Sequence, residues 1–170
     1  VLGRKASDES VEIRRKANPD GPFSALVFKI TADQHGDLYF IRVYSGTLKA
    51  GTRVLNSTQN KKEIVSRIWE MHAEQRIRRD EAVAGDIVAV VGLKYSLTGD
   101  TLCDSHEPVI LEKLKFPEPV ITMSIEPRTN AEKQRLSEAL RTLQREDPTF
   151  RFRYDDETGQ TVISGMGELH

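Results

Sequence analysis

The sequence predicts a mainly β chain, in which an antiparallel β-barrel is followed by a smaller α+β part. Short runs rich in β-branched and aromatic residues recur through the first two thirds of the chain, and glycine-containing turns separate them. Many short strands with glycine turns are typical of a closed or nearly closed antiparallel barrel. The prolines of Phe116-Pro-Glu-Pro mark a boundary, and the pattern beyond it changes to strand, helix, strand and strand.

Composition limits the classes of protein to consider. The chain has 170 residues, 38% of them apolar, a formal net charge of −1 and one cysteine. This length allows one domain or two small ones. The single Cys103 excludes an internal disulfide and fits a reducing compartment. No apolar run approaches the roughly 18 residues of a membrane span. Because the chain starts at Val1 rather than Met, we expect a fragment of a longer protein.

The barrel is expected over residues 22–107, after a polar arm or linker at residues 1–21 that ends in Asn-Pro-Asp-Gly. Leu26, Phe28 and Ile30 alternate with Val27 and Lys29, which predicts a strand. The further strands are expected at residues 38–45, 52–57 and 86–92. Glycine in the intervening turns supplies the positive φ that tight turns need.

Residues 61–79 are the one stretch with uneven charge. Six basic side chains stand there against three acidic ones: Lys61, Lys62, Arg67, Arg76, Arg78 and Arg79. Periodicity fits a helix and a strand equally well, and the barrel context favours strands. The six cations are candidates for contact with the phosphates of RNA, which requires Lys and Arg on one surface. A solvated strand or helix face is the alternative.

The second unit is expected at residues 117–170, after a connecting strand or linker at residues 108–116. Thr129-Asn-Ala-Glu132 matches a capping box, and three leucines follow at helical spacing. Pro148 ends that helix. Strands on either side of the helix predict a β-α-β-β unit, the first part of a ferredoxin-like fold. The chain ends at His170, where a second helix would begin, so we expect this unit to be truncated.

No catalytic, cofactor or metal site is predicted. The chain contains no G-x-x-x-x-G-K-[ST] phosphate loop. Asn60-Lys-Lys-Glu63 resembles a guanine-specificity motif only faintly, because its last residue is Glu. The four histidines lack the spacing of zinc ligands. Cys103 stands next to Asp104 with no activating cation nearby in the sequence, so a buried structural thiol is expected.

Several segments resemble translation elongation factor G of bacteria or organelles. The run FIRVYSGTLKAGTRVLNS together with AGDIVAVVGL and TGDTLCD is similar to its second domain, and EDPTF with GMGELH is similar to its third. The resemblance covers residues 12–170. It implies a translation-factor-type β-barrel followed by a ferredoxin-like domain, within a ribosome-dependent GTPase that moves tRNA and mRNA through the ribosome.

The same resemblance implies partners and site residues. The barrel would contact small-subunit ribosomal RNA, with Arg42 as a candidate, or else Arg42 is an exposed strand charge. The third domain would face a small-subunit protein and the protein's own GTPase domain. Pro119, Asp147, Thr149 and His170 match positions near the fusidic acid site. GTP and Mg²⁺ would belong to the parent protein, and this fragment would be a non-catalytic scaffold in the cytoplasm, without membrane or DNA partners.

Three alternatives to this interpretation exist; mixed charges argue against the second, and the net charge of −1 and the 6% aromatic content argue against the third. A related GTPase of the ribosome-protection or release-factor type differs in the helix that continues GMGELH. A stand-alone enzyme would need a convergent acid–base or metal cluster. A general RNA-binding barrel would need a basic excess and exposed aromatic side chains on one face.

Overall fold

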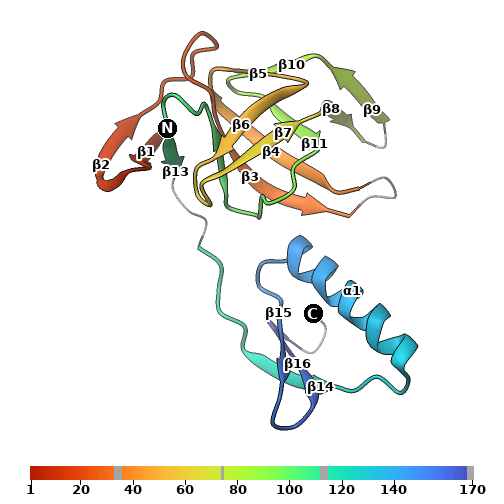
Figure 1. Ribbon diagram of the computed structural model, residues 1–170. Helices are drawn as coiled ribbons and strands as arrows, with labels where there is room; N and C mark the ends of the chain where they lie inside the picture. Colours follow the sequence, from red (N-terminus) through yellow and green to blue (C-terminus); the bar gives the residue numbers. More distant parts are fainter. Residues whose placement is uncertain (33–35, 74, 112–114, 168–170) are drawn as a thin grey trace. The chain divides into compact units, whose positions relative to one another are not determined.

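The chain forms two compact units, residues 1–114 and 115–170, which are coloured red to green and green to blue in Figure 1. The computed structural model describes residues 1–32, 36–73, 75–111 and 115–167. Strands dominate the first unit, and the second unit contains the helix. The predicted mainly β fold class with an α+β C-terminal part is confirmed.

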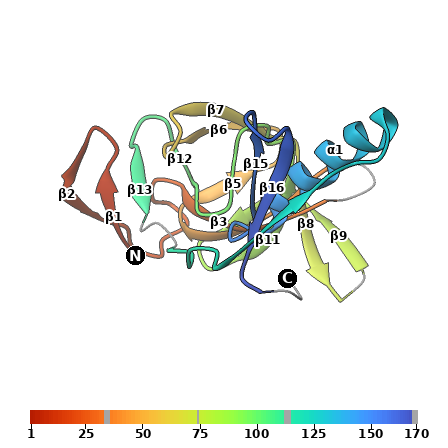
Figure 2. The same ribbon diagram turned by 90° about the horizontal axis from the view of Figure 1, so that it is seen from below.

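One curled eight-stranded sheet forms the body of the first unit, and all of its neighbouring strands are antiparallel. In spatial order it contains β7 (Lys61–Val65), β6 (Thr52–Asn56), β12 (Thr101–Cys103), β3 (Ser24–Thr31), β4 (Leu38–Ser45), β11 (Ile87–Val91), β8 (Arg67–His72) and β9 (Gln75–Arg79). Only Ser66 separates β7 from β8, although the two strands lie near opposite edges of this order. The sheet must therefore curl round to bring them together, as Figure 2 shows.

The inner face of the curled sheet holds the main core. Along β4, Tyr39, Ile41 and Val43 are buried and point inward, whereas Phe40 and Arg42 alternate with them on the outer face. The ambiguous stretch 61–79 contains β7, β8 and β9, so the expectation of strands is confirmed. Periodicity could not decide this point, because pairing partners rather than local pattern stabilise these strands.

Residues 1–21 differ from the prediction of a polar arm. They carry β1 (Leu2–Lys5) and β2 (Asp8–Arg14), which form a three-stranded sheet with β13 (Val109–Leu111). Strand β13, which pairs with β1, lies about a hundred residues away in the sequence, so no local sequence pattern could predict this pairing. A second core forms where this small sheet meets the outer side of the curled sheet; it contains Leu26, Cys103, Val109 and Leu111.

A short two-stranded ladder and one tight turn complete the first unit. Strand β5 (Thr47–Lys49) pairs with β10 (Glu81–Val83). Gly46 precedes β5 with φ +73°, and a Cβ there would lie 2.5 Å from the backbone of Phe23. Only glycine fits this position, because both the left-handed backbone and the close approach exclude a side chain.

The second unit has the predicted β-α-β-β order. It consists of β14 (Ile121–Ile125), α1 (Asn130–Glu146), β15 (Arg151–Asp155) and β16 (Gln160–Gly165), and its antiparallel sheet has the order β14-β16-β15. This is the order of the corresponding strands in a split β-α-β fold. The capping box is confirmed: the Thr129 hydroxyl accepts from the Glu132 amide and the Glu132 carboxylate accepts from the Thr129 amide, each at 3.2 Å.

Packing in the second unit is lighter than in the first. Leu140 is the one described side chain of α1 that is fully buried, and Tyr154 on β15 is 52% exposed. A cavity of about 240 Å³ lies between α1 and β15, lined partly by Leu136, Leu140 and Phe152.

Candidate nucleic-acid interface

The β8–β9 ribbon separates the predicted basic residues by face. Trp69 lies directly opposite Arg78 and Met71 opposite Arg76. Opposite residues of an antiparallel pair share a face, and Arg67 joins them because it is two residues before Trp69. Arg67, Arg76 and Arg78 therefore lie on the outer face, and all three are exposed. The ribbon projects from the curled sheet in Figure 1.

Arg79 takes the other side of the ribbon, since it lies opposite the buried Ile68. Its guanidinium binds the Glu70 carboxylate, with Nη1 2.6 Å from Oε2. The other carboxylate oxygen of Glu70 lies 2.9 Å from Nε2 of His72. Arg79 thus has a carboxylate partner of its own and does not share the face of the other three arginines.

Arg42 shares the outer face with the three ribbon arginines. It lies opposite Ile87 on β11 and Leu26 on β3. Its guanidinium carbon stands 5.2 Å from the centre of the Tyr44 ring, a cation–π contact that orders the side chain while leaving it exposed.

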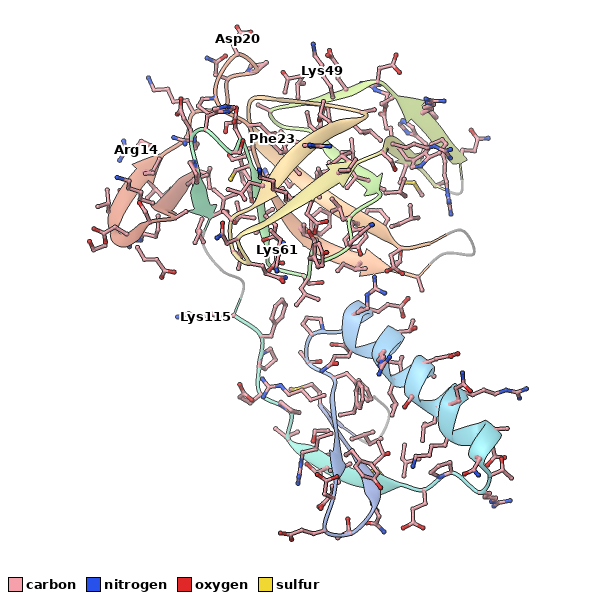
Figure 3. The ribbon with its side chains drawn as sticks, in the orientation of Figure 1. Arg14, Asp20, Phe23, Lys49, Lys61 and Lys115 are labelled. Carbon is pink, nitrogen blue, oxygen red and sulfur yellow. The ribbon has the colours of Figure 1, made fainter. Side chains whose placement is uncertain are left out.

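Lys61 and Lys62 lie elsewhere, on β7 at the far edge of the sheet order. Figure 3 shows Lys61 at the lower end of the barrel, away from the β8–β9 ribbon of Figure 1. The Lys61 ammonium lies 5.6 Å from the centre of the Tyr95 ring. The structure therefore does not bring the six basic residues of segment 61–79 into one patch.

Glu63, the last residue of the Asn-Lys-Lys-Glu run, is buried and holds the loop that carries Tyr95. Its carboxylate accepts from the amides of Lys94 and Tyr95 at 2.8 and 2.9 Å and from the Ser96 hydroxyl at 2.9 Å. The residue is only 2% exposed. Burial, with a smaller contribution from the charge of Glu63, raises the pKa of Tyr39. Glu63 thus has a structural role that the sequence did not reveal.

Sequence reasoning also did not predict a row of side chains that runs across the outer face. In order across the strands it runs Arg78, Trp69, Ala89, Phe40 and Lys29, each opposite the next. The Lys29 ammonium lies 5.7 Å from the Phe40 ring centre. The row juxtaposes cations and aromatic rings from five strands. The aromatic-rich strand LYFIRVYS contains one of these rings, Phe40, but only the pairing register shows that the five side chains form a row.

Cys103 is fully buried, as predicted. Burial raises the pKa of its thiol above the usual 9.0, and hydrogen bonds with the Val109 backbone and the Ser57 side chain oppose this only in part. Arg15, whose side chain is 11% exposed, is a nearby cation that the sequence did not predict, but it lowers the thiol pKa least. The arrangement favours the inert protonated thiol.

In the second unit, three of the four predicted fusidic acid positions, Pro119, Asp147 and Thr149, lie near one end of the sheet. The Asp147 carboxylate accepts from the amide and the hydroxyl of Thr149, at 2.8 and 2.6 Å, where α1 ends. Glu118, next to Pro119, binds Arg151 at the start of β15 through two contacts of 2.7 and 3.0 Å. His170 lies outside the described residues.

Within the described ranges, no three His, Cys, Asp or Glu side chains are placed to share a metal ion. The described part of the chain also has no helix with the length and apolar character to cross a membrane.

Comparisons with known proteins agree for both units. A family model described as Elongation factor G domain 2 matches residues 22–105, and one described as Elongation Factor G, domain III matches residues 116–170. The chain is 56% identical over 160 residues to proteins named Elongation factor G from Chlamydia caviae and Chlamydia trachomatis. Those alignments cover 94% of this chain and 23% of each relative.

A crystal structure of a protein from Thermus thermophilus resembles the chain with a TM-score of 0.73 and 29% identity, over 89% of this chain and 23% of that one. The chain thus spans about a quarter of the length of the relatives that it matches. It belongs to the elongation factor G family and corresponds to the second and third domains of that factor.

Proposed function

We propose that this chain is the ribosome-contacting scaffold of a translocase, an elongation factor that promotes GTP-dependent movement of tRNA and mRNA through the ribosome. GTP and Mg²⁺ would be bound by the GTPase domain of the whole protein. No phosphate loop occurs in this sequence, so the chain itself would contribute contact surfaces rather than phosphoryl transfer. The proposal places the protein in the cytoplasm, where it would meet ribosomes.

One observation carries the assignment of a contact surface. The outer face of β3, β4, β11, β8 and β9 presents five exposed cations: Lys29, Arg42, Arg67, Arg76 and Arg78. No acidic side chain occupies the outward positions of these five strands, all of which lie in the described ranges. The chain as a whole has a net charge of −1, so the positive charge is local. A local cationic face is what contact with an RNA backbone requires.

Small-subunit ribosomal RNA is the proposed partner of this face. Lys61, Lys62 and Arg79 are weaker candidates, because the first two lie on another part of the barrel and the third lies on the other face of the β8–β9 ribbon. Such a surface makes few phosphate contacts, so binding by the isolated chain should be weak and sensitive to salt.

For the second unit we propose contact with a small-subunit protein and with the GTPase domain. Pro119, Asp147 and Thr149 would then contribute to the fusidic acid region. The hydrogen bonds between Asp147 and Thr149 and the Glu118–Arg151 pair support this, because they fix the end of α1 and the segment before β14 in place. His170 stays a prediction from the sequence.

Co-sedimentation with isolated small ribosomal subunits tests the proposal. The chain should sediment with the subunits at low salt and be released at high salt. The double variant Arg42→Glu, Arg78→Glu should bind more weakly. The control Lys5→Glu, Lys49→Glu makes the same charge change at exposed lysines away from the outer face and should bind better than the first variant. Equal binding by the two variants would contradict the assignment of the face.

A further inference from the structure

We propose that the outer face binds an unpaired stretch of RNA, with a base stacked on Trp69 and the flanking phosphates held by the neighbouring arginines. The inference rests on the proposed function, because it specifies the form of RNA that this face takes. It differs from a purely electrostatic contact, which would not distinguish a duplex from a single strand.

Two aromatic rings lie in the row of side chains across the outer face, with a cation at each end. Trp69 and Phe40 are opposite Ala89 from its two sides, and Arg78 and Lys29 stand at the ends of the row. Adjacent strands lie about 4.8 Å apart, so the two rings are attached about 10 Å from each other. Ala89 places only a methyl group between them. The row therefore offers two ring surfaces bracketed by two cations.

The two rings differ in their contacts. The Phe40 ring is accompanied by the Lys29 ammonium and by the Phe28 ring, whose centre is 6.3 Å away. Trp69 is half-buried. Among the described residues, the structure shows no aromatic, cationic or hydrogen-bonding partner for its indole. A partly exposed indole without such a partner, held on a strand, is ready to stack with a base.

Arginine side chains surround the Trp69 ring on the outer face. Arg78 is opposite Trp69, and Arg67 and Met71 precede and follow it on the same face of β8. Arg76 and Arg42 lie on the same outer face. Proteins that bind single strands combine cations that track the backbone with aromatic rings on which bases stack. Bases in a duplex are already stacked on each other, so only an unpaired strand can present a base to Trp69.

The chain offers a direct probe, because Trp69 is the single tryptophan among its 170 residues. A fluorescently labelled ten-nucleotide oligouridylate and a ten-base-pair RNA duplex are titrated into the 170-residue chain at low salt. Binding is followed by anisotropy of the label and stacking by the tryptophan emission of unlabelled mixtures. The single strand should bind and quench the emission saturably, whereas the duplex should bind without quenching.

Substitution at the ring provides the second readout. Trp69→Leu keeps an apolar side chain but removes the stacking surface, so it should weaken binding of the single strand by about fivefold or more. Binding of the duplex should change less than twofold. Trp69→Phe, which keeps a ring, should retain most of the affinity, and the nearly unchanged duplex binding of Trp69→Leu would show that its loss is not due to misfolding.

These measurements distinguish base stacking on Trp69 from the phosphate contacts of the proposed function. If both RNAs bind but neither quenches Trp69, or if Trp69→Leu binds the single strand as the wild type does, base stacking is refuted and the phosphate-contact function stands. If neither RNA binds at low salt, the proposed function fails together with the stacking. Quenching by a ten-residue polyglutamate equal to that by RNA would also overturn the assignment of RNA as the occupant.

Discussion

Replacement of Glu63 by alanine should destabilise the first unit strongly, although Glu63 belongs to a charged run that resembles a solvated surface. The residue is 2% exposed, and its carboxylate accepts three hydrogen bonds from the loop at residues 94–96. Each buried donor that loses its partner costs about 1–3 kcal/mol. Lys94 and Tyr95 are themselves exposed residues, so water can replace part of the loss at their amides.

Taking the lower limit for each of the three donors gives a loss of about 3 kcal/mol for Glu63→Ala. Glu63→Gln should cost about 1–1.5 kcal/mol, because the amide oxygen can take over the two bonds to Tyr95 and Ser96 while its NH₂ group faces the Lys94 amide. The order of the two variants therefore tests the hydrogen bonds rather than the volume of the side chain.

Urea unfolding followed by the emission of Trp69 measures this loss. With an m-value of about 1–3 kcal/mol/M, a loss of about 3 kcal/mol lowers the midpoint by about 1–3 M. Glu81→Ala, at an exposed glutamate of the same unit, should shift it little. A double-mutant cycle with Ser96→Ala should show a coupling of at least about 0.5 kcal/mol, because the two side chains are hydrogen-bonded. If Glu63→Ala matches Glu81→Ala, the structural role of Glu63 is refuted.

Three further expectations concern backbone, titration and relative stability. Gly46→Ala should lower the free energy of unfolding, measured with urea, by about 3 kcal/mol or more, because its Cβ would meet the Phe23 backbone at 2.5 Å. Gly51→Ala has free space around its Cβ and should lower it by only about 1–2 kcal/mol, the strain of the left-handed backbone. Burial raises the pKa values of Cys103 and Tyr39 in the folded state. The stability that these two groups contribute is therefore fully present below their usual pKa values of 9.0 and 10.0, and it is lost as the pH rises from there through the raised values. The urea midpoint should fall between about pH 8 and about pH 10.5, and a constant midpoint would contradict this expectation. Amide hydrogen exchange should protect β3, β4 and β11 more strongly than β14 and β16, because the second unit has little buried apolar surface, and equal protection of both units in a monomeric chain would contradict it.

Local patterns were enough to predict some elements of the fold. The strand at Leu38–Ser45 and the capped helix at Asn130–Glu146 were predicted because enrichment in β-branched and aromatic residues and the Thr129–Glu132 capping box act within a few residues. The strands in residues 1–21 were missed, since β1 and β2 depend on β13 for pairing. Register explains the remaining difference at the candidate site.

The pairing of β8 with β9 decides which arginines share a face. Arg78 and Arg79 were equivalent candidates in the sequence, yet the register puts Arg78 beside Trp69 on the outer face and Arg79 beside Glu70 on the other. A shift of one residue would have exchanged them. The row that joins Trp69 to Phe40 likewise depends on several strand pairings, none of which a single-strand pattern reveals.

The salt dependence of binding to small ribosomal subunits tests the central claim most directly. The logarithm of the binding constant is measured against the logarithm of salt concentration for the wild type and for the variant with Arg67, Arg76 and Arg78 replaced by alanine. Each phosphate contact contributes about 0.7–0.9 to the slope, so the account predicts that the variant's slope is shallower by about 2–3. An unchanged slope in a folded variant would contradict the claim that the outer face of the barrel meets ribosomal RNA.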